Sequence, residues 1–424
     1  MLSENKTIKF LINYRLQILW AIAVILIAYF LFYSVNHISN PSNGFASYYT
    51  ASKLIMEGEN PSDFYNDEYF SNKVKNYVPG IYEIYLVNLP TTGLLLLPLA
   101  YFDYSTARVF WISCNLILLA VTMFFIVKRM QIKIELLPFV LVLIFSFQPL
   151  YSNVAHAQAY ILIFCLLVFS FLGIRAGKNF MPGFLVGITF ITKSAGIFLI
   201  LLFIILKKWK SLAWAGITII ILTVITFPVL GYNSWMVYAD RLMNYSSDPS
   251  LSVTAYQSIF SFFHHLFIFN KEWNPNPILD LPIIGYSVTL MFSLCILLMT
   301  VFNTIKYKNT ELAFASFISA GLILNPTSID YHYVLILIPI LILIDWLMKN
   351  QSRIIWLTFI LSFLLIALSI PYLSPKVSDG FLALLAYPKL YGAVGLWYLS
   401  LVAAKTSKSE SLEKNVKQLH YIPH

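Results

Sequence analysis

Long apolar segments alternate with short polar links along most of the chain. A helix rises about 1.5 Å per residue, so a run of roughly 20 apolar residues crosses the ~30 Å hydrocarbon core of a bilayer. We therefore predict an all-α polytopic membrane protein with about twelve transmembrane helices. The predicted spans are 16–35, 105–127, 136–151, 160–174, two short helices within 181–206, 212–230, 283–302, 312–324, 333–348, 354–373 and 387–404.

Lys193 interrupts the apolar segment 181–206. A single helix there would hold the Lys193 ammonium group in the middle of the membrane, which costs several kcal/mol unless the charge is paired or hydrated. It would also carry the basic cluster at 207–210 to the outer side. Two short helices hinged at Lys193 and Ser194 avoid both penalties, so we expect a hairpin.

Two segments between the spans, about 36–90 and 231–280, are too long to be simple links. In the first, apolar residues recur at helical spacing over 45–56 and 64–74, which predicts two amphipathic helices at the outer membrane surface. The apolar segment 91–102 would be about 18 Å long as a helix, too short to span. We expect it to be a re-entrant or surface helix.

The positions of the charges favour one topology. Only 11% of the residues are charged, and most lysines and arginines of this +9 chain lie in alternate links. Because positive residues gather in cytoplasmic links, this pattern predicts both termini in the cytoplasm and both long loops outside. The positive charge therefore does not indicate nucleic-acid binding. We expect a multi-pass protein of the cell membrane, with one transmembrane unit (1–404) and a cytoplasmic tail (405–424).

The sequence gives no indication of a cleaved signal peptide, a disulfide framework or a metal site. The first apolar run is longer than the core of a cleavable signal, so we expect it to remain as a span. Cys114, Cys165 and Cys295 lie inside apolar segments. We interpret them as small core residues and predict neither a disulfide framework nor a metal or other cofactor.

Polar residues that the apolar context does not explain fall mostly on the predicted outer side. A bilayer penalises such groups unless they line water or pair with one another. Their shared side predicts one cavity that opens outward. These residues are the acidic group of the first outer loop, which includes Asp63, together with His156, Gln158, Lys193, Gln257, His264, His265, Asp330 and His332.

Each of these residues also has a structural explanation. Lys193 could be a loop residue that reaches the interface, and His156 and Gln158 could bond free carbonyl groups at a helix end. The adjacent histidines lie among phenylalanines, which favours a buried or interfacial role. Asp330 and His332, two residues apart at the mouth of a predicted span, are the strongest candidates for chemistry.

An ordered set of short motifs runs through most of the chain. Their order and hydropathy resemble glycosyltransferase family 87, polytopic membrane enzymes of the GT-C class. The resemblance implies a GT-C-like helix bundle. The motif residues are Phe45, Tyr48, Tyr49 and Ala51; Gly58 and Pro61; Pro90 and Pro98; Arg108, Trp111 and Asn115; Ala157 and Gln158; Gly183, Gly187, Lys193 and Ser194; Gln257 and Ser258; Pro326, Ser328, Asp330 and His332.

The resemblance also implies an activity. It implies inverting transfer of a hexose, typically mannose, from a polyprenyl-phosphate sugar to a glycolipid or glycan acceptor on the outer face, without a nucleotide sugar or an obligatory metal. One position departs from the family: the aspartate that usually precedes Phe45 is Gly44 here. Either another carboxylate, Asp63 or Asp330, replaces it, or the chain is an inactive relative.

The chemistry of such a transfer suggests roles for the candidates. A carboxylate can take the proton of the acceptor hydroxyl, and a leaving phosphate needs cationic or other hydrogen-bond donors. A polytopic transporter or flippase is the alternative, although no internal repeat typical of transporters is apparent. We therefore expect Asp330, His332 and Asp63 as catalytic residues, and Lys193, Gln158, His156, Gln257, Tyr48 and Tyr49 as residues that bind the sugar or phosphate.

Overall fold

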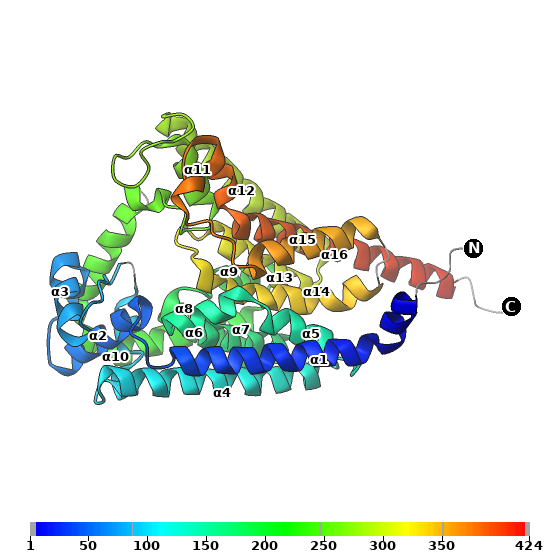
Figure 1. Cartoon of the computed structure of the whole chain (residues 1–424), viewed down its shortest axis with the longest axis horizontal. Coiled ribbons are helices and arrows are strands. Elements are labelled where there is room, and N and C mark those ends of the chain that lie inside the picture. The colour runs from blue at the N-terminus through cyan, green and yellow to red at the C-terminus, as the bar shows by residue number, and fades with distance from the viewer. Residues whose placement is uncertain (1–5, 87, 246–247, 350–351, 420–424) are drawn as a thin grey trace.

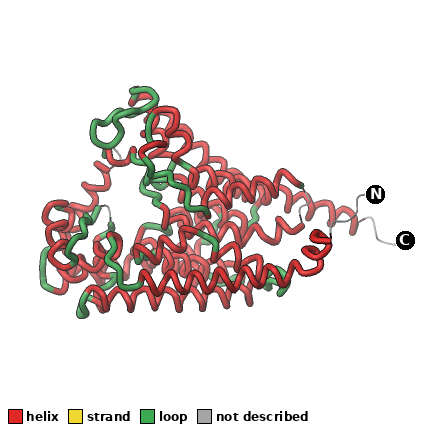
Figure 2. The backbone as a smooth tube through the Cα atoms, viewed as in Figure 1, coloured by secondary structure: helices red, strands yellow, loops and turns green. Residues whose placement is uncertain are grey.

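Helices and connecting loops make up the chain in the computed structural model, which describes residues 6–86, 88–245, 248–349 and 352–419 (Figure 2). The start of α1 (Lys6–His37) and the end of α16 (Pro388–Leu419) lie at the same end of the bundle, and α2 (Asn43–Met56) and α3 (Asp67–Tyr77) lie at the opposite end (Figure 1). The described ends of α1 and α16 therefore lie together, and the side of the membrane that they occupy stays a prediction.

Five helical segments of the described residues are long and apolar enough to cross a bilayer. Their surfaces are apolar: Ile25 and Val224, for example, are 65% and 64% exposed. Such surfaces are favourable in lipid and costly in water, so the chain is an all-α membrane protein. The five segments are Tyr14–His37 within α1, α4 (Tyr104–Met130), α10 (Trp209–Tyr245), α12 (Pro282–Tyr307) and Asp330–Lys349.

The predicted number of twelve spans is not confirmed. A bent pair adds a sixth candidate, since its two helices meet at 49°. The other apolar helices are short: sixteen residues rise only about 24 Å. These elements are the bent pair α5 (Leu137–Phe145) and α6 (Gln148–His156), and the short helices α7 (Tyr160–Arg175), α8 (Phe180–Lys193), α9 (Ile197–Ile205), α13 (Thr310–Leu324) and α15 (Arg353–Ala367). The helix α14 (Leu337–Lys349) belongs to the spanning segment Asp330–Lys349.

Two local predictions are confirmed. The apolar segment 181–206 breaks after Lys193, because Ser194 adopts a left-handed conformation (φ 52°) before α9 begins at Ile197. The first outer loop forms two helices, α2 and α3, close to the predicted ranges. However, α2 is largely buried against neighbouring elements, so it is a core element of the loop.

Other details differ from the prediction. Segment 91–102 forms the short 3-10 helices η2 (Pro90–Leu94) and η3 (Leu97–Leu99), and α10 continues past a kink at Gly231 to Tyr245. The second outer loop, predicted over 231–280, begins at this kink and contains the last part of α10, η4 (Pro249–Ser252) and α11 (Ile259–Phe267). The core assignment of the cysteines is wrong for two of them: Cys114 and Cys295 are exposed on the lipid-facing helices α4 and α12.

A buried guanidinium joins the ends of three elements near the first outer loop. Arg108 of α4 is completely buried, and its Nη2 donates to the carbonyl oxygens of His37 (3.2 Å) and Ala155 (2.7 Å), while Nη1 donates to Ser42 Oγ. One turn later, Trp111 Nε1 donates to the carbonyl oxygen of Ala157 (3.0 Å). Because the last carbonyls of a helix have no partner within it, these donors fix the ends of α1 and α6.

Replacing this guanidinium should destabilise the fold. Arg108→Met keeps the apolar length of the side chain but leaves these buried carbonyl oxygens without donors, so we expect the free energy of unfolding to fall by about 3 kcal/mol. Thermal unfolding in detergent measures the change. Arg129→Met, at the exposed end of α4, is the matched control and should unfold like the wild type. Equal stability of the two variants would contradict the role given to Arg108.

Candidate functional site

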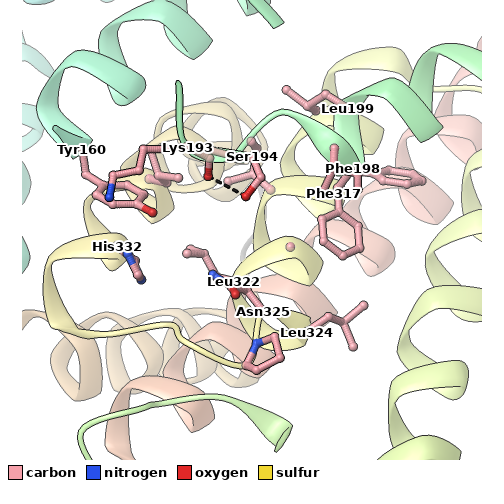
Figure 3. A pocket seen from close by; sticks show the side chains of 16 residues that line it. Tyr160, Lys193, Ser194, Phe198, Leu199, Phe317, Leu322, Leu324, Asn325 and His332 are labelled. Atoms are coloured by element: carbon pink, nitrogen blue, oxygen red, sulfur yellow. Dashed lines mark hydrogen bonds between the residues drawn. The ribbon is translucent and has the colours of Figure 1, made fainter. Parts of the chain in front are cut away.

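A cavity of about 220 Å³ lies where α8 ends, α13 ends and the 3-10 helix η5 (Asp330–Ile336) begins. Its two ends differ in chemistry. Tyr160, Lys193 and His332 gather on one side, and Phe198 and Phe317 lie on the other (Figure 3). The cavity is therefore amphipathic, with cationic and hydrogen-bonding groups at one end and apolar walls at the other.

The Lys193 side chain is held by groups from the first outer loop. Its Nζ donates to Asn88 Oδ1 (2.6 Å) and lies 4.5 Å from the centre of the Tyr48 ring. It also interacts electrostatically with Glu83. An ammonium group has three N–H bonds, and Asn88 uses one of them. Lys193 can therefore still donate to a ligand.

The His332 ring is fixed in one orientation. Its Nδ1 accepts a hydrogen bond from the Ile329 backbone N–H (2.9 Å), and its centroid lies 4.1 Å from that of Tyr160. In a neutral imidazole only one nitrogen carries the proton. Because Nδ1 is the acceptor, that proton lies on Nε2. His332 therefore supplies one N–H donor to the wall of the cavity, close enough to Lys193 for the two to interact electrostatically.

Gln158 connects Tyr48 to the first turn of α2. The Tyr48 hydroxyl donates to Gln158 Oε1 (2.5 Å), and Gln158 Nε2 would lie 1.8 Å from a Cβ atom at position 44. Position 44 therefore needs glycine while Gln158 keeps this conformation. The structure thus brings Lys193, Tyr48 and Gln158 together, and the amide of Gln158 fills the space beside Gly44 where a side chain would begin.

Comparison with known protein families gives a match. The sequence model of glycosyltransferase family 87 matches residues 87–327, more than half of the chain. The chain belongs to glycosyltransferase family 87. This membership, together with the apolar helices, identifies a membrane glycosyltransferase, and the resemblance seen in the sequence is confirmed. No curated protein and no solved structure matches the chain.

Asp330 of this glycosyltransferase has an ionic partner that the sequence did not indicate. Its Oδ1 lies 2.5 Å from Nζ of Lys389, which is almost completely buried and also donates to the carbonyl oxygen of Ile366 (3.0 Å). A base in this ion pair would have to give up its counter-ion to take a proton. The pair provides a structural explanation for Asp330, and the catalytic role remains a prediction.

The structure places the remaining predicted residues at different distances from the cavity. His156 ends α6, with its ring centroid 6.1 Å from that of Tyr331 beside His332. The Tyr49 hydroxyl donates to the Phe102 carbonyl oxygen (2.8 Å). The side-chain amide of Gln257 forms hydrogen bonds with the backbone of Thr254, Ala386 and Lys389. Asp63 is exposed on η1 (Pro61–Tyr65). Of the predicted site residues, Lys193 and His332 line the cavity, whereas Tyr48, Tyr49, His156, Gln158, Gln257, Asp63 and Asp330 are not among its lining residues.

The two histidines of α11 lie outside the cavity lining as well. His265 Nδ1 and Nε2 lie 2.5 Å from the carbonyl oxygens of Ser252 and Ser378, so the ring joins the second outer loop to the loop before α16. His264 is buried against Phe260, with ring centroids 4.0 Å apart. These contacts agree with the buried role that their phenylalanine neighbours suggested.

Three residues beside the site were missed in the sequence: Glu83, Asn88 and Tyr160. Glu83 is partly buried, and this burial raises its pKa to about 7. The sequence feature that could have indicated this burial is the run of aromatic and aliphatic residues around Glu83, namely Tyr82, Ile84 and Tyr85. A lone carboxylate in such a run is more often buried than the acidic residues of a polar helix.

A double substitution separates the two roles open to Asp330. Asp330→Asn alone leaves the Lys389 ammonium buried and unpaired, so we expect the free energy of unfolding to fall by about 3–5 kcal/mol. Asp330→Asn combined with Lys389→Met removes both charges and should recover most of that loss. Thermal unfolding in detergent measures both effects. Glycosyl transfer by the stable double variant would give Asp330 a structural role alone, whereas a folded double variant without transfer would place Asp330 in the chemistry.

Proposed function

We propose that this membrane glycosyltransferase moves a hexose, with mannose as the first candidate, from a polyprenyl-phosphate donor to a hydroxyl of a glycolipid or glycan. The transfer takes place on the outer face and inverts the anomeric carbon. The observation that carries the proposal is the amphipathic cavity, because a lipid-linked sugar phosphate is itself a polar group attached to an apolar chain.

The polar end suits the phosphate of the donor. When the sugar leaves, negative charge grows on the phosphate oxygens, and fixed donors in a site of low dielectric constant stabilise it strongly. Lys193 Nζ and His332 Nε2 belong to two rigidly held side chains at this end. We therefore assign the phosphate to these two residues, and the Tyr160 and His332 rings, in contact at an interplanar angle of 59°, form the wall behind it.

The apolar end suits the isoprenoid chain. Phe198, Phe317 and Leu324 line it, and Ile197 beside them is 51% exposed on the helix surface. A cavity of about 220 Å³ is smaller than the roughly 300–1,000 Å³ of typical ligand sites. It can take the phosphate and the first carbons of the lipid, while the rest of the chain stays in the bilayer.

Loss of the phosphate donors should slow transfer. We expect Lys193→Met and His332→Ala each to reduce the rate by roughly 10²–10³-fold, as removal of a preorganised donor does in other sites. The assay supplies membranes containing each variant with polyprenyl-phosphate mannose labelled with tritium and follows label in glycolipid and glycan fractions.

Lys210→Met provides the matched control, because Lys210 is an exposed residue of α10 in the predicted cytoplasmic cluster. It should transfer at the wild-type rate. Wild-type transfer by both cavity variants would remove Lys193 and His332 from the proposed site. Movement of the lipid across proteoliposomes without transfer would favour the transporter alternative.

A further inference from the structure

We propose that Glu83 is the general base that accepts the proton of the acceptor hydroxyl. This inference rests on the proposed function, and it assigns the one chemical role that the cavity itself leaves unfilled. The cavity holds donors for a leaving phosphate, whereas a hydroxyl nucleophile also needs a nearby acceptor for its proton.

Two hydrogen bonds hold the segment around Glu83 against the first turns of α2. Asn43 Nδ2 donates to the Tyr82 carbonyl oxygen (3.2 Å), and Ser47 Oγ donates to the Ile84 carbonyl oxygen (3.4 Å). They bracket Glu83 on both sides. The carboxylate is therefore carried by a segment fixed beside Gly44, in the part of the loop from which Tyr48 reaches Lys193.

The Glu83 carboxylate lies within electrostatic reach of the site residues Lys193 and Tyr48. Its Oε1 accepts from the adjacent Ile84 N–H (3.1 Å), and its charge acts on Lys193, Tyr48 and Tyr331. Lys193 in turn interacts with His332. The Glu83 carboxylate and the Lys193 ammonium therefore interact with each other, and the neutral His332 imidazole interacts with the same ammonium.

Other carboxylates of the same loop are held differently. Glu59 pairs with Lys73 (2.7 Å), and Asp67 pairs with Arg241 (2.5 Å). Asp63 is exposed on η1. Glu59 and Asp67 are thus paired with cations, and Asp63 is exposed to solvent. Among these carboxylates, Glu83 alone combines partial burial with an electrostatic contact to the cavity lysine.

The chemistry balances with one base. The acceptor oxygen forms a bond to the anomeric carbon as its proton passes to the Glu83 carboxylate. The bond between the anomeric carbon and the phosphate oxygen breaks, and its electron pair leaves with the lipid phosphate toward Lys193 and His332. Attack from the loop side, opposite the phosphate, inverts the anomeric carbon. Because burial raises the pKa of Glu83 to about 7, its carboxylate is a stronger base than an ordinary glutamate.

The test compares Glu83→Gln, Glu83→Asp and Glu68→Gln in the full-length protein in lipid nanodiscs. Glu68 is an exposed residue of α3 in the same loop and serves as the control. The assay measures transfer of tritium-labelled mannose from polyprenyl-phosphate mannose between about pH 5 and pH 9, and binding of unlabelled polyprenyl phosphate.

We expect wild-type and Glu68→Gln turnover to rise as the pH increases from about 5 to about 7, because the Glu83 carboxyl group loses its proton over this range. Glu83→Gln should be slower by roughly 10²–10⁴-fold, should lose this rise, and should bind polyprenyl phosphate as the wild type does. Glu83→Asp should keep part of the rate and the rise with pH.

Each other outcome is decisive. Wild-type turnover and pH dependence in Glu83→Gln would overturn the assignment of Glu83 and leave the proposed function standing. Loss of phosphate binding in Glu83→Gln and Glu83→Asp alike would show a structural role and also overturn it. A wild-type protein that binds polyprenyl phosphate but transfers no sugar would overturn the proposed function, and the base with it.

Discussion

The fold must supply hydrogen-bond or ionic partners to the basic side chains that lipid or protein shields from water. Three basic side chains meet this constraint in different ways. Arg108 bonds backbone carbonyl groups at helix ends, and Lys389 pairs with Asp330. Lys193 has a neutral amide and an aromatic ring as its closest partners. The first two arrangements satisfy the charge and join helices, whereas the third holds the charge in place and leaves donors free. The same constraint therefore stabilises the bundle at two places and creates a binding site at the third.

The site lies where several helices end, and polar groups gather there because helix ends carry unpaired polar backbone groups. Ala157 and Ser194 both adopt left-handed conformations (φ 44° and 52°) that end α6 and α8. Short helices leave polar termini below the membrane surface, because about 24 Å of rise cannot cross a ~30 Å core. Irregular backbone at that depth is tolerated when it lines a cavity or is buried in protein. Four short helices, α7, α8, α9 and α13, thus line the cavity together with the start of the segment Asp330–Lys349.

Local patterns in the sequence predicted the helical membrane class, the break at Lys193, the two helices of the first outer loop and the family. They did not predict the number of spans, because a short apolar helix and a full span differ by only a few residues. They also missed pairs that are distant along the chain. Nothing near Asp330 indicates Lys389, and nothing near Gly44 indicates that Gln158 fills its space. Glu83 was overlooked because its importance depends on which way a loop faces, and hydrophobic periodicity carries no such information.

The central claim is that the amphipathic cavity holds a lipid phosphate. An experimental structure of the full-length protein in nanodiscs with polyprenyl phosphate tests it directly. The phosphate oxygens should lie about 2.7–3.2 Å from Lys193 Nζ and His332 Nε2, with the first isoprenoid carbons against Phe198 and Phe317. An empty cavity with the phosphate bound elsewhere, for example in the hollow lined by Arg175 and Lys349 at the other end of the bundle, would contradict it.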